Sequence, residues 1–349
     1  MKKVTEGKTK ICVETQQVVN KKMPSFYNPV MTTNRDFTLL VLNALEKKEL
    51  TIIDPLAGTG IRSLRILKEL KPEKTKKIVI NDIKKGFKEK LEQNLELNKL
   101  SKEKIIIRNE DANKVLNTEG HFDYVDIDPF GTPNPFLDSA IRALNRNAIL
   151  GVTATDTSAL CGSYSSACKR KYWAEPLRNE LMHEFATRIL IRKVQLIGAQ
   201  HEKALTPLVS YATDHYIKIF FESQNNKTKT DEIIKKHELY KEKGPIWTGI
   251  INNHEFIKKM LNQNLEINKK TLKLLKILEE ESTIQEPFFY DLHEIASQQK
   301  TKTIPRKEQL IQELQKTGYE ATRTHFNENA IKTNASKKEL IKKFKKIIR

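Results

Sequence analysis

Apolar and polar positions follow two alternating patterns through the first part of the chain. Short apolar runs predict buried strands at residues 51–54, 78–81, 105–108, 124–127 and 148–154. Longer stretches with apolar residues at helical spacing separate several of these runs and predict helices at residues 61–70, 87–95 and 134–145. Strands that alternate with helices are typical of a doubly wound parallel sheet. The pattern therefore predicts an α/β fold.

Two further segments precede the first predicted strand of this sheet. Residues 4–19 alternate loosely and predict a hairpin that turns near Gly7. The nearly continuous apolar run at residues 37–45 predicts a buried helix, with Asn34 or Asp36 placed to cap its N-terminus.

After residue 157 the alternation changes. Residues 175–191 predict one long helix, and residues 194–199 and 216–221 are apolar enough for two more strands, the second at an edge of the sheet. Cys161 lies in this region, and a catalytic cysteine is one interpretation of it. Because the sequence places no base beside Cys161, we do not favour that role.

The composition becomes polar at residues 223–228, and we place a domain boundary there, between domains at residues 1–223 and 224–349. The second part predicts a smaller basic α+β domain, in which helix, strand and lysine-rich helix resemble a winged helix. Its expected elements are a lysine-rich helical region at 255–278, a helix at 305–318, a strand at 319–326 and a last helix from 336.

The net charge of the chain indicates the kind of partner that the protein binds. The 349 residues include 62 Lys and Arg against 44 Asp and Glu, a formal charge of +18, which favours a polyanion such as RNA. A membrane surface is the competing partner, but no apolar run approaches the ~20 residues that span a bilayer. With no apolar signal region and three cysteines outside Cys-x-x-Cys spacing, we expect a cytoplasmic protein without a metal site or disulfide framework.

A glycine turn follows the first predicted strand, with Asp54 at its mouth, Gly58 and Gly60 within it, and Arg62 in the helix behind it. Nucleotide-binding and methyl-donor-binding folds share such turns. The carboxylate of Asp54 would repel a pyrophosphate, whereas it tolerates the sulfonium and ammonium groups of S-adenosylmethionine. Asp82, at the end of the next strand, is placed to accept hydrogen bonds from ribose hydroxyls.

The end of the third strand is expected to lie over the adenine. There Asp111 could accept from the exocyclic amine while the backbone N–H of Ala112 donates to the ring.

Asp128-Pro129-Phe130-Gly131 ends the fourth predicted strand, and it combines a carboxylate with an aromatic ring. Ligands gather at the carboxyl ends of strands in open α/β sheets. A carboxylate beside a flat apolar face suits a planar, nitrogen-bearing substrate such as a nucleobase. The alternative is a solvent-exposed Asp-Pro turn.

Several motifs taken together resemble one family, the tRNA (guanine-26, N2)-dimethyltransferases, over most of the chain. Each motif alone is unspecific, but their order and combination are specific. They are the aromatic loop from Phe26 to Asp36, the glycine turn from Asp54 to Arg62, the Asp128–Pro133 stretch, Thr153-Ala154-Thr155-Asp156, and Thr322-Arg323-Thr324-His325-Phe326.

This resemblance implies a Rossmann-like class I methyltransferase sheet, tRNA as the partner and S-adenosylmethionine as the cofactor. It implies that Asp128 is the catalytic acid–base group and that Phe26 and Phe130 hold the target guanine. The residues implied to bind the cofactor, including those of the glycine turn, are Arg35, Asp54, Gly58, Arg62, Asp82, Asp111 and Ala112.

The chemistry of such a reaction assigns a task to each group. The N2 amine of guanine is a poor nucleophile, so Asp128 would accept one of its protons while the Pro129 carbonyl accepts the other N–H. Arg35 and Arg62 could fork the methionine carboxylate. The alternatives are that Arg62 lies on the helix surface and that the two phenylalanines only pack in the core.

In one respect the chain departs from the family pattern. Many relatives carry paired cysteines just before a Gly-Pro-(Leu/Ile)-Trp segment, and here Gly244-Pro245-Ile246-Trp247 is present while residues 235–243 contain no cysteine. A metal staple at this place is therefore in doubt.

Three other functions compete with this interpretation. A methyltransferase for another exocyclic amine, such as adenine N6, would use similar residues. A catalytically silent RNA-binding protein would not need Asp54, Asp82 and Asp128 together. A nicotinamide oxidoreductase is disfavoured by Asp54 at the mouth of the glycine turn.

Overall fold

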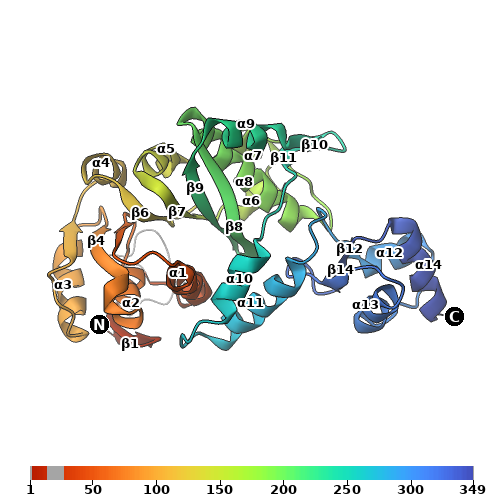
Figure 1. The fold of residues 1–349 in the computed structure, drawn as a ribbon, viewed down its shortest axis with the longest axis horizontal. Helices are drawn as coiled ribbons and strands as arrows, with labels where there is room; N and C mark the ends of the chain where they lie inside the picture. The colour runs from red at the N-terminus through yellow and green to blue at the C-terminus, as the bar shows by residue number, and fades with distance from the viewer. Residues whose placement is uncertain (1, 14–26, 349) are drawn as a thin grey trace.

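A mixed β-sheet forms the centre of the computed structural model, which describes residues 2–13 and 27–348. In these residues seven strands pair in the order β5-β4-β3-β6-β7-β9-β8 (Figure 1). The strands are β3 (Leu50–Asp54), β4 (Thr75–Asn81), β5 (Ile105–Arg108), β6 (Phe122–Ile127), β7 (Leu144–Ala154), β8 (Lys203–Thr213) and β9 (Tyr216–Asn225). The first five run parallel, and β8 and β9 are antiparallel additions. The predicted α/β fold is thus confirmed.

Successive residues of the central strands face opposite sides of the sheet, and each side has its own hydrophobic core. Ile52, Ile78 and Tyr124 contribute to one core, and their neighbours Ile53, Val79 and Val125 to the other. The first core is covered by α1 (Thr32–Ala44), α2 (Ile61–Glu69) and α3 (Phe87–Leu97). The second is covered by α4 (Ala112–Thr118), α5 (Asn134–Arg142) and α8 (Met182–Gln200).

Three sequence predictions after β7 are wrong. Residues 194–199, predicted as a strand, lie within α8, and this helix begins at Met182, not at residue 175. Its residue Val194 is fully buried in the second core. An apolar run this short fits a buried helix as well as a strand, so burial in the tertiary structure decides. The strand beginning at Tyr216 is not an edge strand, because β8 pairs on its outer side.

The N-terminal hairpin is confirmed as β1 (Lys2–Glu6) and β2 (Thr9–Val13), with Gly7 at a φ of +55° in the turn. The predicted cap of α1 is wrong. The helix begins after the short 3-10 turn η1 (Pro29–Met31), so that Asn34 and Asp36 lie inside it and are buried.

Residues 227–281 pack on the sheet and its covering helices. They form α9 (Lys227–Lys235), the hairpin of β10 (His237–Tyr240) and β11 (Lys243–Trp247), α10 (His254–Leu261) and α11 (Lys269–Glu281). In the hairpin, Ile246 and Trp247 join the second core, and Gly244 exchanges two backbone hydrogen bonds with Glu175 at 2.7 and 2.8 Å. Hydrophobic packing therefore holds the segment that lacks the paired cysteines.

A third core belongs to residues 290–348 alone, here called the C-terminal unit. Its elements are β12 (Tyr290–Asp291), α12 (Leu292–Gln298), α13 (Lys307–Gln315), β13 (Ala321–Arg323), β14 (Ala330–Thr333) and α14 (Lys337–Ile348). The boundary at residues 223/224 stays a prediction, and the division of the hydrophobic cores favours a later one, near residue 290.

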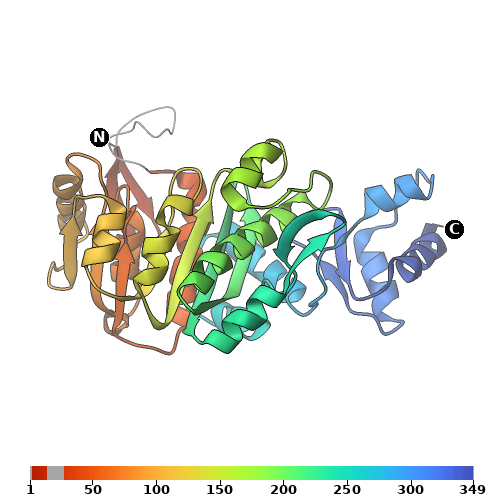
Figure 2. The same ribbon diagram turned by 90° about the horizontal axis from the view of Figure 1, so that it is seen from above.

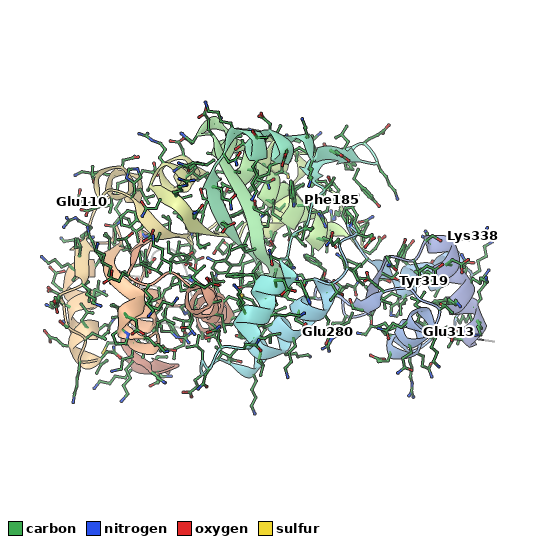
Figure 3. All side chains as sticks on the ribbon, viewed as in Figure 1. Glu110, Phe185, Glu280, Glu313, Tyr319 and Lys338 are labelled. Atoms are coloured by element: carbon green, nitrogen blue, oxygen red, sulfur yellow. The ribbon has the colours of Figure 1, made fainter. Side chains whose placement is uncertain are left out.

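The C-terminal unit lies at one end of an elongated molecule, and β1 lies toward the other (Figure 2). Figure 3 marks Glu313, Tyr319 and Lys338 on this unit and Glu280 at its junction with α11. At the junction the Arg323 guanidinium donates two hydrogen bonds of 2.7 Å to Glu280. None of the described helices combines the length and apolarity needed to cross a bilayer.

Candidate active site

The carboxyl ends of four parallel strands bring polar side chains to one edge of the sheet. Asp54 ends β3, Asp82 follows β4, Asp128 follows β6 and Thr155 follows β7. Parallel strands place these ends side by side, which is where ligands bind in open α/β sheets. The acids that the sequence located at separate strand ends are therefore brought to one place.

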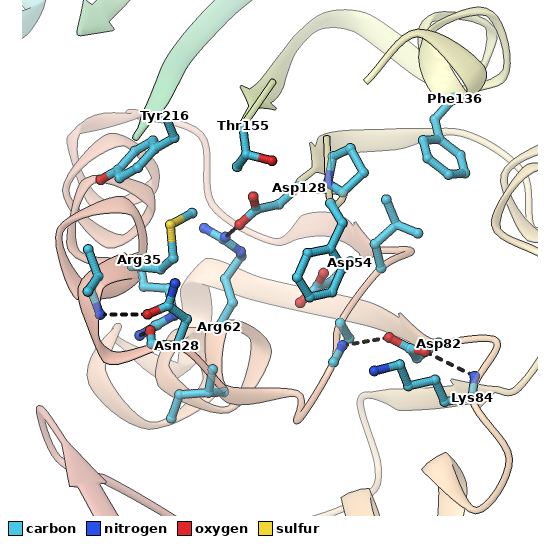
Figure 4. Close-up of a pocket in the computed structure, with 18 of the residues that line it drawn as sticks. Asn28, Arg35, Asp54, Arg62, Asp82, Lys84, Asp128, Phe136, Thr155 and Tyr216 are labelled. Atoms are coloured by element: carbon cyan, nitrogen blue, oxygen red, sulfur yellow. Dashed lines mark hydrogen bonds and ion pairs between the residues drawn. The ribbon is translucent and has the colours of Figure 1, made fainter. Parts of the chain in front are cut away.

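A cavity of about 610 Å³ opens at this edge (Figure 4). Eight of the residues predicted from the sequence line it: Arg35, Asp54, Gly58, Arg62, Asp82, Asp128, Pro129 and Phe130. The sequence analysis included Asn28, Met31 and Thr155 in motifs but gave them no role, and it missed His215 and Tyr216; all five line the cavity. Tyr216 begins a strand that reaches this edge only because β9 pairs antiparallel to β7.

The glycine turn is fixed to the neighbouring strand by Asp82. The backbone N–H of Gly58 donates to Asp82 Oδ2 at 2.8 Å, and Lys84 N–H donates to the other oxygen at 3.0 Å. Gly60 has a φ of +77°, and a Cβ there would lie 2.4 Å from Leu91 Cδ1, so only glycine fits. The carboxylate of Asp82 is thus held rigidly at the cavity wall.

Arg62 is buried, so the alternative that it lies on the helix surface is excluded. Its Nε pairs with Asp126 Oδ2 at 2.8 Å, and its Nη2 pairs with Asp128. Its Nη1 donates to Asn34 Oδ1 at 2.8 Å and to Thr38 Oγ1 at 2.7 Å. Arg62 therefore fixes the orientation of the Asp128 carboxylate. A dashed line in Figure 4 marks their ion pair.

A buried lysine lies behind this pair. Lys218, in β9, is fully buried, and its Nζ lies 2.5 Å from Asp126 Oδ1. Burial acts against the ionised form, but Arg62 and Lys218 together lower the pKa of Asp126. The side chain of Asp126 thus stays ionised and links Lys218 to Arg62.

Asp54 is the carboxyl group of this cluster whose ionised form is most disfavoured. Burial, followed by repulsion from Asp126 and Asp128, raises its pKa to about 7, although Arg62 and a 2.9 Å hydrogen bond from Ser63 act in the opposite direction. Two cations, Arg62 and Lys218, already balance two carboxylates. A cationic ligand beside Asp54 would therefore stabilise its ionised form.

Arg35 is held by the N-terminal hairpin. Its Nε and Nη2 donate to the two oxygens of Glu6 at 2.6 and 2.5 Å, and Nη2 also donates to the Asn28 carbonyl at 3.0 Å. Burial opposes the ionised form of Glu6, but Arg35 and Arg65 lower its pKa to about 2. Among the described residues, Arg35 Nη1 has no hydrogen-bonding partner. Sequence analysis gave no signal for Glu6, which lies 29 residues away.

Of the remaining predicted residues, Asp111 and Ala112 are not in the cavity wall. Asp111 caps α4, accepting from the Asn113 and Lys114 N–H groups at 2.9 and 3.1 Å, and neither it nor Ala112 lines the cavity. The same turn is joined to the site by Asn109, whose side chain donates to the Asp82 carbonyl at 2.5 Å. Phe26 lies outside the described residues.

Phe130 is 37% exposed at the cavity rim, so it does not pack in the core. Two hydrogen bonds fix its loop: Thr155 N–H donates to the Gly131 carbonyl at 2.9 Å, and Gly131 N–H donates to Thr155 Oγ1 at 2.6 Å. Gly131 has a φ of +83°, which favours glycine. This turn leaves both Asp128 and the ring of Phe130 facing the cavity.

Among residues 2–13 and 27–348, no group of three or more His, Cys, Asp or Glu side chains could hold a metal ion. The three cysteines are free.

Comparisons with known proteins agree with this geometry. A family model described as N2,N2-dimethylguanosine tRNA methyltransferase matches residues 7–242 and 236–345. Proteins named tRNA (guanine(26)-N(2))-dimethyltransferase are 38% identical in Methanobrevibacter smithii, over 100% of this chain and 97% of theirs, and 36% in Pyrococcus horikoshii, over 99% and 98%. The structure of Trm1 from Pyrococcus horikoshii with S-adenosyl-L-methionine matches with a TM-score of 0.88 and 34% identity, covering 98% of this chain and 99% of that one. The resemblance inferred from the motifs is thus confirmed, and the chain belongs to the N2,N2-dimethylguanosine tRNA methyltransferase family.

Proposed function

We propose that this protein transfers one or two methyl groups from S-adenosylmethionine to N2 of the guanosine at position 26 of tRNA. The observation that carries the proposal is a single cavity with the glycine turn and Asp82 on one side and Asp128, Pro129 and Phe130 on the other. A cofactor and a base can therefore lie next to each other within it. We also propose that it acts in the cytoplasm.

The cavity suits the cofactor in both charge and shape. Three carboxyl groups line it, those of Asp54, Asp82 and Asp128, while Ile83 and Phe136 offer apolar surface for the adenine. The bound cofactor supplies a methyl group activated on a cationic sulfur. We assign Asp82 to the ribose hydroxyls and Asp54 to the positive groups, because a buried carboxylate favours a nearby cation.

The methionine carboxylate is assigned to Arg35 and Arg62, with unequal shares. Arg62 already uses most of its N–H groups on Asp126, Asp128 and Asn34. Arg35 keeps Nη1 available, so it is the main donor. The turn that carries Asp111 and Ala112 is assigned to the adenine, supported by the contact between Asn109 and Asp82.

Asp128 is assigned as the proton acceptor. Its carboxylate is paired with Arg62 and can accept a hydrogen bond from the N2 amine. When the methyl group passes to N2, its bond to the cationic sulfur would break and leave a neutral thioether. The nitrogen would become cationic and its proton strongly acidic, so that even the arginine-paired carboxylate of Asp128 could take it. Pro129 contributes the carbonyl for the second N–H. Positioned proton transfer of this kind contributes ~10²–10⁴-fold to the rate.

The base must leave its stack to reach Asp128, at a cost of a few kcal/mol. Stacking on an aromatic side chain returns ~1–3 kcal/mol per base. Phe130 at the rim is one such platform, and we assign Phe26 as the second. The basic residues from 224 onward are assigned to the tRNA backbone, and α14 supports this with exposed lysines such as Lys338 and Lys345.

Methyl transfer to defined tRNA tests the proposal directly. Unmodified tRNA is incubated with labelled S-adenosylmethionine, digested to nucleosides and analysed for the methylated base. We expect N2-methylguanosine and N2,N2-dimethylguanosine, and no label in tRNA with adenosine at position 26. Label in N6-methyladenosine, or in guanosines elsewhere, would overturn the proposal.

A matched pair of variants separates catalysis from binding. Asp128→Asn keeps the shape of the side chain but removes the acceptor charge, and we expect transfer to fall by ~10²-fold or more while donor binding persists. Asp138→Asn, on an exposed part of α5, is the control and should transfer normally. Normal turnover of Asp128→Asn would remove Asp128 from its role.

A further inference from the structure

A second hollow of about 410 Å³ adjoins the active-site cavity. The two share His215 and Tyr216, at the turn between β8 and β9. We call it the histidine pocket. Its other lining residues come from α6 (Thr157–Leu160) and the loop behind it, from the start of α8, from β8, β9 and the turn between them, and from the C-terminal unit: Thr157, Ser158, Cys161, Ser163, Met182, His183, Ala212, Thr213, Asp214, Ile217, His325 and Phe326.

His183 provides a neutral ring in this pocket. Its Nδ1 lies 3.7 Å from Cys161 Sγ, and within the described part of the chain its Nε2 has no hydrogen-bonding partner. Burial and the nearby His325 lower the pKa of His183. Burial also raises the pKa of the Cys161 thiol to about 11, so the cysteine beside this ring stays protonated and is not a nucleophile.

The hydroxyl groups of the pocket are also unused. Among the described residues, the side chains of Thr157, Ser158, Ser163 and Thr213 make no hydrogen bond. Polar groups that converge on a hollow without pairing to one another are typical of a site for a polar ligand. This pocket therefore offers several free donors and acceptors at once.

No unpaired carboxylate, lysine or arginine is found among the described residues that line the pocket. Asp214, its only carboxylate among the described lining residues, receives hydrogen bonds of 2.8 and 2.7 Å from Lys270. His325 is held by Glu281 through Nδ1 at 2.6 Å and accepts the Ala212 N–H through Nε2 at 3.3 Å. Within residues 2–13 and 27–348, neither lysine nor arginine lines the pocket, so a phosphate is not the expected occupant. Neutral hydroxyls, imidazole and the Phe326 ring suit a nucleobase with its ribose.

The position of the pocket relates it to the methylated base. Thr155 lines the active-site cavity and Thr157 lines the histidine pocket, two residues further along the same chain segment. The basic helix α7 (Ser165–Tyr172), with exposed Lys169, Arg170 and Lys171, follows Ser163 directly. An RNA backbone that runs past α7 would bring one nucleotide to each hollow.

We propose that the histidine pocket binds the nucleoside next to the methylated guanosine, holding its base and ribose while Asp128 acts on its neighbour. This inference rests on the proposed function. It assigns to Ser158, His183 and Thr213 a share in tRNA specificity.

Two variants and one control test this assignment. In His183→Ala and in Ser158→Ala, we expect kcat/KM for tRNA to fall about five- to tenfold, the loss of one hydrogen bond, with an unchanged KM for S-adenosylmethionine. His121→Ala, at the opposite end of β6, should change neither value. Ser158 is exposed, so its variant keeps the fold even if the change at His183 disturbs α8.

Substrates that lack a single base distinguish recognition from structural damage. Wild-type enzyme is given tRNA with an abasic nucleotide at position 25 or at position 27. With wild type, we expect kcat/KM for one of these substrates to be about five- to tenfold lower than for intact tRNA. With His183→Ala, the missing base should cause no further fall in kcat/KM, because both changes remove the same contact.

The assignment of the pocket would be overturned if, at both positions, the loss in kcat/KM from the missing base and the loss from His183→Ala multiplied. Unchanged kcat/KM in both His183→Ala and Ser158→Ala would also overturn it. Failure of the wild type to methylate guanosine in intact tRNA would instead overturn the proposed function.

Discussion

The affinity for S-adenosylmethionine should depend on pH through Asp54. Its pKa of about 7 in the free protein means that the carboxyl group is ionised at pH 8 and mostly protonated at pH 6. A sulfonium and an ammonium group favour the ionised form, so binding releases a proton whenever Asp54 starts protonated. Affinity should therefore rise with pH up to about 7 and level off above it.

The magnitude follows from the fraction of ionised Asp54. If only the ionised form binds, the apparent Kd is multiplied by 1 + 10^(7 − pH), about 1.1 at pH 8 and about 11 at pH 6. The Kd should thus weaken about tenfold, or about 1.4 kcal/mol, between these two pH values. The charged neighbours that set this pKa are Arg62, Asp126 and Asp128.

Isothermal titration calorimetry at pH 6, 7 and 8 measures the effect, and buffers of different ionisation enthalpy report the released proton. The amino group of the ligand titrates near ~8, and His215 lines the same cavity, so wild type is compared with Asp54→Asn. Both proteins share those contributions. A pH dependence that is the same in wild type and Asp54→Asn would refute the reasoning.

Three other changes have expected outcomes. Lys218→Met leaves Asp126 fully buried with one cationic partner fewer, and we expect the free energy of unfolding in urea to fall by ~3–5 kcal/mol; a loss below ~1 kcal/mol would contradict the pairing. Glu6, with its pKa lowered to about 2, stabilises the fold above pH ~4.5 and loses this contribution as the pH falls toward 2. In acid unfolding over this range, the free energy of unfolding of the wild type should fall by ~3 kcal/mol more than that of Glu6→Gln, and equal falls would refute the assignment. Lys338→Gln with Lys345→Gln should weaken tRNA binding and make the slope of log K against log salt shallower by one to two, whereas an unchanged slope would remove α14 from the tRNA interface.

Local patterns were sufficient for the strands that build the active site. Runs such as 78–81 and 124–127 alternate faces and end in acids, and parallel pairing requires those ends to meet at one edge. Burial of both faces explains why these runs are mostly apolar, with Asn81 and Asp126 as buried polar exceptions. The cavity and eight of its residues could therefore be located without coordinates.

Local patterns failed where a segment had two acceptable conformations. The apolar run 194–199 fits a strand or a buried helix, and its packing in the second core selects the helix. Asn34 and Asp36 resemble caps, but the tertiary structure buries them beside Arg62 and Arg65. A buried arginine needs an acceptor, and this need outweighs the local preference for a cap.

The sequence by itself determined the order of the strands from β3 to β7, the glycine turn and the acids at the strand ends, because these depend on residues close together in the chain. Only the tertiary structure decided how those acids are charged. Lys218 reaches Asp126 across 92 positions, and Arg35 reaches Glu6 across 29. Electrostatic interactions depend on distance and burial, not on separation along the chain, so the balance of charge around Asp54 and Asp128 exists only in the folded protein.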